Sequence, residues 1–125
     1  MKRFNKKQLR EIKIGRREGL DVSVYNKPKY NAGQMREIRY GLQKNLDVYK
    51  YIKPWICVEQ MREIRTGLSQ GLDVSVYSDP KYSWEQMYEI HKGLFHGLDV
   101  TKYTKPEYDA SQMREIRLSL SDMEE

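Results

Sequence analysis

The chain has 125 residues, of which 38% are apolar and 33% are charged, and this balance is typical of a globular domain. It contains no apolar run of the roughly 18 residues that a membrane span needs and no apolar leader at its start, which predicts an unexported, cytoplasmic protein. The single cysteine, Cys57, excludes an internal disulfide. The net charge of +5 favours an acidic partner, either nucleic acid or an acidic protein surface.

One short string recurs along the whole chain. QMREIR begins at three glutamines, and the near-copies QLREIK and QMYEIH begin at two more, always 26 residues apart. These five glutamines are Gln8, Gln34, Gln60, Gln86 and Gln112. A fixed period between about 20 and 50 residues is the signature of stacked repeats, each of which buries its apolar side against its neighbours.

The full unit reads Q-M-R-E-I-R-x-G-L-x-x-G-L-D-V-S-x-Y-x-x-P-x-Y. The sequence therefore predicts a single repeat domain over residues 1–125. Its units cover about 4–29, 30–55, 56–81 and 82–107, followed by a terminal helix over 108–125.

A helix start precedes each glutamine. Asn5, Asn31, Ser83 and Asp109 are favoured N-cap residues, and each stands three residues before a glutamine, which is the spacing of a capping box. Cys57 takes this place in the third unit and is expected to lose the capping bond. Long helices are predicted over 6–18, 32–44, 58–70, 84–96 and 110–121.

The long helices are expected to end at residues that accept a left-handed backbone, and short helices to follow. These residues are Gly19, Asn45, Gly71 and Gly97. An aspartate then caps a short helix that a proline stops, which predicts short helices over 22–26, 48–52, 74–78 and 100–104. The predicted fold is all-α, a short α-solenoid of long-helix/short-helix repeats, with the right-handed winding usual for α-solenoids.

A glycine in the middle of a long helix recurs in register. Gly15, Gly41, Gly67 and Gly93 hold this position, and Ser119 holds it in the last helix. Each such glycine costs roughly 0.5–1 kcal/mol relative to alanine. The repetition of this cost predicts that a neighbouring element approaches the helix closely.

The stretch EQMREIRTGLSQGLDVSVYSDPKYSWEQM resembles a short helical repeat of proteins from phages, plasmids and integrative elements of Gram-positive gut bacteria. The resemblance spans nearly the whole chain. It implies an accessory protein of a mobile element, directed against host defence in the manner of an anti-CRISPR inhibitor. It carries no catalytic residues with it.

No motif of an enzyme stands out, and we predict no catalytic residues, metal or cofactor. His91 and His96 lie five residues apart and so do not share a helix face as a metal-binding pair would. Paired cysteines, a phosphate-binding glycine loop and a Gly-x-Ser-x-Gly nucleophile motif are absent from the sequence. The glutamate that recurs in every unit is interpreted as architectural.

Basic residues recur at the third and sixth positions of the units, beside the apolar stripe of each long helix, and the first unit adds one at its tenth position. They form a ladder of Arg10, Lys13 and Arg17, then Arg36 and Arg39, Arg62 and Arg65, and Arg114 and Arg117. Two interpretations remain open at this stage. The ladder pairs with the recurring acidic residues across repeat interfaces, or it binds the phosphates of a nucleic acid.

The fourth unit breaks this ladder, because Tyr88, His91 and Phe95 replace the basic residues and Trp84 lies one turn earlier. Exposed aromatic residues on one helix face are typical of a protein-binding hot spot or of a platform on which unpaired bases stack. The alternative is that they fill space in a partly buried stripe. Related changes in the second unit add three further candidates, which are Tyr40, Tyr49 and Trp55.

We therefore predict a non-catalytic binding protein that docks onto another protein through these aromatic residues. The resemblance suggests a host defence effector as that partner. Nucleic-acid binding by the basic ladder is the alternative function. The sequence also leaves open whether Leu118 and Leu120 cap the stack or join two copies as a homodimer.

Overall fold

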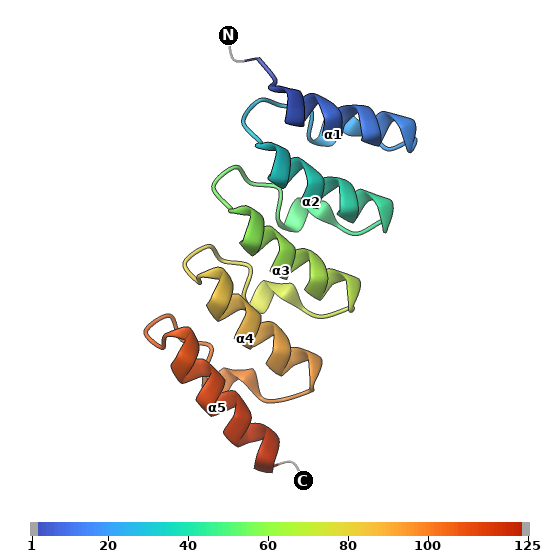
Figure 1. Cartoon of the computed structure of the whole chain (residues 1–125). Helices are drawn as coiled ribbons and strands as arrows, with labels where there is room; N and C mark the ends of the chain where they lie inside the picture. The colour runs from blue at the N-terminus through green and yellow to red at the C-terminus, as the bar shows by residue number, and fades with distance from the viewer. Residues whose placement is uncertain (1–2, 124–125) are drawn as a thin grey trace.

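The computed structural model describes residues 3–123 and is helical throughout, with α-helices alternating with single turns of 3-10 helix. This order confirms the predicted all-α fold (Figure 1). The elements are α1 Lys6–Arg17, η1 Val22–Val24, α2 Ala32–Gln43, η2 Val48–Lys50, α3 Val58–Ser69, η3 Val74–Val76, α4 Trp84–Phe95, η4 Val100–Lys102 and α5 Ala110–Met123.

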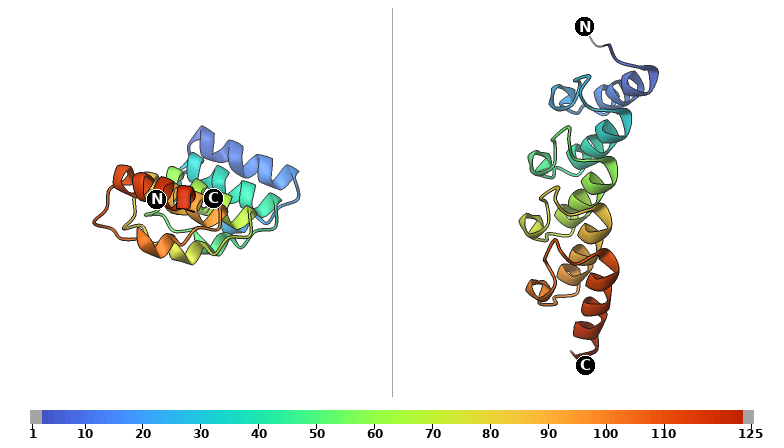
Figure 2. Two further views of the ribbon diagram at one scale, coloured as in Figure 1. Left: turned by 90° about the horizontal axis from the view of Figure 1, so that it is seen from below. Right: turned by 90° about the vertical axis from the view of Figure 1, so that its left-hand side faces the viewer.

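The helices are arranged as a solenoid of two layers. The long helices lie side by side in chain order, and each contacts the next one along the chain. The short helices form a second layer on one side of them, and α1 and α5 lie at opposite ends of the stack (Figure 2). Each short helix packs on the long helix that precedes it.

The winding of the chain is left-handed, so the right-handed sense expected from other α-solenoids is wrong. In Figure 1 the chain runs left to right along each long helix, returns behind it through the short helix, and moves one level down. The physical reason lies in the faces of one helix. In α2, Gly41 faces the short helix, Arg39 faces the preceding unit and Glu37 faces the following one. A right-handed α-helix sets the rotational order of these faces and hence the winding.

The N-termini of the long helices are built as the glutamine spacing predicts. In α1 the Asn5 side chain accepts a hydrogen bond from the Gln8 backbone N–H at 2.8 Å, and the Gln8 side chain accepts from the Asn5 N–H at 2.8 Å. In α3 the same geometry is built around a weaker acceptor. The Cys57 backbone N–H donates to Gln60 at 3.1 Å, and a thiol stands where the caps of α1, α2 and α4 present an oxygen to the helix.

Replacing Cys57 with serine is expected to stabilise the protein by about 1 kcal/mol, because a serine hydroxyl accepts the bond that a thiol accepts poorly. Urea unfolding monitored by circular dichroism measures the change. The serine already present at the start of α4, Ser83, accepts from the Gln86 N–H at 3.1 Å and shows that this cap geometry suits a hydroxyl. An unchanged or lower unfolding midpoint would contradict the expectation.

The long helices end as predicted, in a residue with positive φ. Gly19, Gly71 and Gly97 have φ between 71° and 75°, and Asn45 has φ 55°. The short helices are briefer than predicted, with three residues each. Each ends at a tyrosine that leaves helical geometry, as Tyr25 does at φ −132°.

These tyrosines explain the glycines in the middle of the long helices. Tyr51 is fully buried, and its hydroxyl donates a hydrogen bond of 2.7 Å to the backbone carbonyl of Glu37 in α2. A Cβ placed on Gly41 would lie 2.2 Å from the Tyr51 hydroxyl oxygen and 2.5 Å from Val48 Cγ1. The same contact recurs in all four full units, so the glycine makes room for the short-helix layer.

Replacing Gly41 with alanine is expected to destabilise the protein by about 2 kcal/mol, because a methyl group is forced into a packed contact. The same change in a Tyr51→Phe background is expected to cost less, since the hydroxyl that it meets is gone. Urea unfolding of the four proteins gives this coupling as a double-mutant cycle. Ser119→Ala is the control, because Ser119 occupies the equivalent position, is exposed, and already carries a Cβ.

Candidate protein-binding surface

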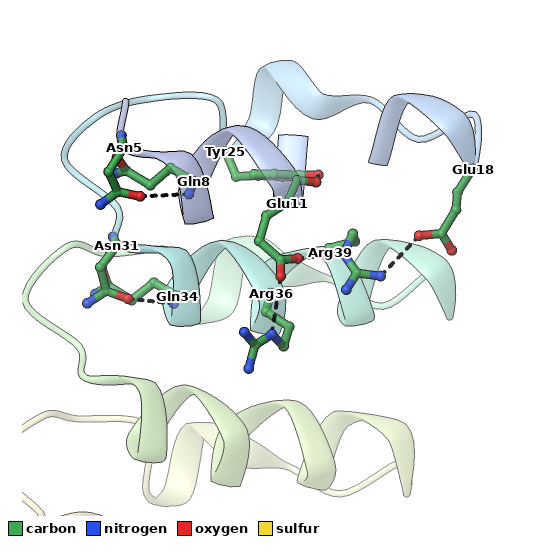
Figure 3. A network of polar contacts seen from close by, with 9 residues as sticks. All are labelled: Asn5, Gln8, Glu11, Glu18, Tyr25, Asn31, Gln34, Arg36 and Arg39. Atoms are coloured by element: carbon green, nitrogen blue, oxygen red, sulfur yellow. Dashed lines mark hydrogen bonds and ion pairs between the residues drawn. The ribbon is translucent and has the colours of Figure 1, made fainter. Parts of the chain in front are cut away.

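The basic ladder is built into the interfaces between units. Glu11, buried on α1, accepts hydrogen bonds from Arg36 Nε at 3.3 Å and from Arg39 Nε at 2.9 Å, both on α2 (Figure 3). Arg39 also reaches Glu18 at 3.0 Å. One carboxylate thus binds two guanidinium groups of the next unit.

This arrangement recurs in full at Glu37 and with a single arginine at Glu89. Glu37 accepts from Arg62 at 3.1 Å and from Arg65 at 2.6 Å, and Glu89 accepts from Arg117 at 3.0 Å. These arginines therefore pair with glutamates across the repeat interfaces. This is the first of the two interpretations that the sequence left open.

Exposure divides the ladder into two groups. The side chains of Arg39, Arg65 and Arg117 are only 9%, 16% and 12% exposed, so they present little surface to a ligand. Arg36 and Arg62 are about half exposed. The remaining members are exposed and form no ion pair with the described residues; they are Arg10, Lys13, Arg17 and Arg114.

In the fourth unit a buried histidine takes the place of the inner arginine. His91 lies 3.2 Å from Glu63 through Nδ1 and 2.6 Å from Gln70 through Nε2, and it is only 6% exposed. The structure places His91, which was predicted to contact a partner, inside the stack, where both of its ring nitrogens are used. It links α4 to the preceding unit as the arginines do elsewhere.

The other aromatic residues of α4 form an exposed strip. Trp84, Tyr88 and Phe95 are 42%, 37% and 53% exposed. Their spacings of four and seven residues place them on one side of the helix. Gly93 on the same helix faces η4, so the strip lies on the outer face, away from the short-helix layer. We call these three residues the aromatic strip.

A hollow of about 460 Å³ lies beside the aromatic strip, between α4 and α5. Trp84 and Tyr88 line it from α4, and Ala110 lines it from α5 at the position that Trp84 holds one unit earlier. Because alanine is small there, the groove stays open next to the two rings. Glu85 and Arg114 add one charge of each sign to the lining.

The aromatic candidates of the second unit lie elsewhere. Tyr40 is half buried, and its ring lies 5.0 Å from the Arg39 guanidinium and 5.3 Å from that of Arg65, so it packs within the ladder. Tyr49 and Trp55 are each 67% exposed; Tyr49 belongs to η2, and Trp55 belongs to the segment that joins η2 to α3. The predicted aromatic residues therefore come from different kinds of element and not from one helix face.

Residues 3–123 contain no group of three or more His, Cys, Asp or Glu side chains that could hold a metal ion. None of the helices within that range is long and apolar enough to cross a membrane. The hollow beside the aromatic strip offers two exposed rings and a pair of opposite charges. These groups suit binding of a side chain by contact and hydrogen bonding.

The fold and its repeated interfaces define an all-helical repeat protein with a solenoid-like arrangement of long and short helices. Comparisons with protein families, with curated proteins and with solved structures found no match to the chain.

Sequence reasoning assigned Arg114 to the basic ladder and did not consider Ala110 or Glu85. A signal for them exists in the sequence. The two residues after each N-cap vary between units. At the first of these two positions the fourth unit has Trp84, the largest side chain found there, and the last helix has the small Ala110. A large residue followed one unit later by a small one predicts a hollow between adjacent helices.

Proposed function

We propose that the protein is a non-catalytic binding protein of the cytoplasm that docks onto another protein through the aromatic strip and its hollow. The observation that carries the proposal is the exposure of Trp84 and Tyr88 beside an open groove. Large aromatic residues at the centre of an interface commonly supply most of its binding free energy. Tyr88 replaces the outer ladder arginine of this unit, and at this interface it is His91 that contacts the half-buried Glu63.

The chemistry of the hollow suggests how a partner would bind. An apolar side chain of the partner would pack between the Trp84 and Tyr88 rings and displace water from them. Glu85 and Arg114 would pair with polar groups around it. Because the repeat resembles those of mobile-element proteins, the partner that we propose is a component of a host defence system, which the bound protein would inhibit.

Affinity capture from an extract of host cells, followed by identification of the retained protein, tests this function. We expect Trp84→Ala combined with Tyr88→Ala to abolish retention. The same variant should raise the Kd for the purified partner by about 100-fold or more. The matched control is Tyr49→Ala combined with Trp55→Ala, which removes two exposed aromatic residues from η2 and from the segment after it. Loss of binding in the control alone would contradict the proposed surface, as would retention that a nuclease abolishes.

Nucleic-acid binding is a second candidate, favoured by the exposure of Arg10, Lys13 and Arg17 on α1. It predicts that the protein retards DNA or RNA at about 50 mM salt and releases it near 200 mM. Replacing these three residues with glutamine would then remove the retardation. Absence of retardation at low salt would eliminate this candidate.

A further inference from the structure

The two ends of the described stack carry complementary halves of the repeat interface. Inside the stack, one contact recurs at every interface. A glutamine of one unit donates its side-chain amide to a backbone carbonyl of the next, as Gln8 does to Tyr30 at 2.6 Å. At the first two interfaces a buried glutamate also accepts from two arginines of the next unit, and in the first of these Glu18 adds contacts with Arg39 and Gln43.

The acidic half of this interface is exposed on α5. Gln112, Glu115 and Asp122 occupy the positions that Gln8, Glu11 and Glu18 hold in the first unit. All three are exposed, whereas Gln8 and Glu11 are buried by the following unit. The described residues place no basic side chain on Glu115 or Asp122.

The basic half of the interface is exposed on α1. Arg10, Lys13 and Arg17 occupy the positions of Arg36, Arg39 and Gln43, and all three are exposed. Leu9 lies beside them and is 51% exposed, whereas Met35 at the equivalent position of α2 is fully buried. In the stack, α1 covers the face of α2 that carries Met35. Another unit packed against α1 would cover Leu9 in the same way.

We propose that a second copy of this chain binds head to tail, with α1 of one copy packed on α5 of the other as α2 packs on α1. In this register Glu115 would bind Arg10 and Lys13, and Asp122 would bind Lys13 and Arg17. The charges on the two faces are opposite, and their spacing along the helices is the one that the internal interfaces use.

The remaining contacts also continue the internal pattern. The Gln112 amide would reach the backbone carbonyl of Phe4, which stands where Tyr30 stands in the next unit. Within the described residues α5 carries no short helix, so the joint would join long helices only and be weaker than an internal interface. Because the two faces differ, every oligomer keeps one free face at each end. Further copies can therefore add, and the oligomers grow with concentration.

Sedimentation velocity of the wild-type chain over a concentration series, up to about 1 mM, tests the proposal. The mean mass is expected to rise with concentration at low salt and to fall back to that of the monomer near 0.5 M salt, because the joint depends on exposed ion pairs. A wild-type chain that stays monomeric over the whole series would overturn the proposal.

Charge reversal identifies the faces. Glu115→Lys with Asp122→Lys, and separately Arg10→Glu with Lys13→Glu, are each expected to give monomers, because both faces then carry the same sign. An equal mixture of the two variants is expected to associate again. Association of either variant alone, or a mixture that stays monomeric while both unfold at the wild-type urea midpoint, would overturn the proposal.

Two controls separate this joint from other effects. Lys50→Glu with Lys53→Glu changes the net charge by the same amount as Arg10→Glu with Lys13→Glu, but on the short-helix side, and should associate like wild type. The variant that combines Trp84→Ala with Tyr88→Ala should also associate like wild type. If it does not, the aromatic strip rather than the two ends mediates self-association.

Discussion

Raising the pH to about 11 is expected to lower the free energy of unfolding by about 5 kcal/mol. The cause is the set of four tyrosines under the long helices, all fully buried: Tyr25, Tyr51, Tyr77 and Tyr103. Burial raises the pKa of Tyr25 from 10.0 to about 12 and raises the pKa values of the other three further. A loss of this size is comparable to the whole stability of many domains.

The direction of the effect follows from proton binding. Below pH 10 these tyrosines are neutral in both the folded and the unfolded chain, and their contribution to stability is fully present. Above pH 10 the unfolded chain releases the phenol protons, while the folded chain holds them up to its raised pKa values. For each of these tyrosines, the free energy of unfolding of the protein then falls by about 1.4 kcal/mol per pH unit, until the pH reaches the pKa of that tyrosine in the folded chain.

Urea unfolding at a series of pH values between about 8 and 11, with the tyrosinate absorbance followed in parallel, measures this loss. Tyr51→Phe is the informative variant. It should be less stable than wild type at neutral pH, because it lacks the hydrogen bond to the Glu37 carbonyl, yet lose stability less steeply above pH 10. An unchanged slope in this variant would contradict the assignment of the effect to the buried tyrosines.

Replacing Glu37 with glutamine is expected to destabilise the protein by about 3 kcal/mol. Glu37 is 2% exposed and binds both Arg62 and Arg65, so the neutral amide leaves two guanidinium groups without a counter-charge at a repeat interface. Arg65 is the more costly of the two, because its side chain is largely buried. Urea unfolding at neutral pH measures the change.

The chain contains its own control for this experiment. Glu115 occupies the same position of the repeat in α5 but is exposed. Under dilute conditions, Glu115→Gln is expected to change stability by less than about 0.5 kcal/mol. Equal effects of the two substitutions would show that the glutamate acts within its own helix and not through the next unit.

Much of the fold could be predicted because its determinants are local. The caps of the long helices depend on residues three apart, such as Asn5 and Gln8, and their ends depend on single residues such as Gly19. The glycine in mid-helix also predicted a close neighbour correctly. The neighbour itself, a buried tyrosine hydroxyl, was missed because Gly41 and Tyr51 lie ten residues apart in different elements.

Features that depend on how units face one another could not be predicted in the same way. The burial of His91 follows from Glu63 and Gln70 in the preceding unit, and the pairing of Arg39 with Glu11 follows from two helices meeting. The handedness was predicted by analogy and was wrong. The order of Gly41, Arg39 and Glu37 around α2 determines the handedness, but only once it is known which of them faces the short helix, which the preceding unit and which the following unit.

The hydrogen bonds that join neighbouring units link residues between 21 and 28 positions apart, as those from Arg39 to Glu18 and from Arg39 to Glu11 do. The entropy lost in closing such a loop is small and nearly the same at every junction. Folding can therefore begin at any adjacent pair of units and spread in both directions, without waiting for the two ends to meet. The folding rate should accordingly depend little on the number of units.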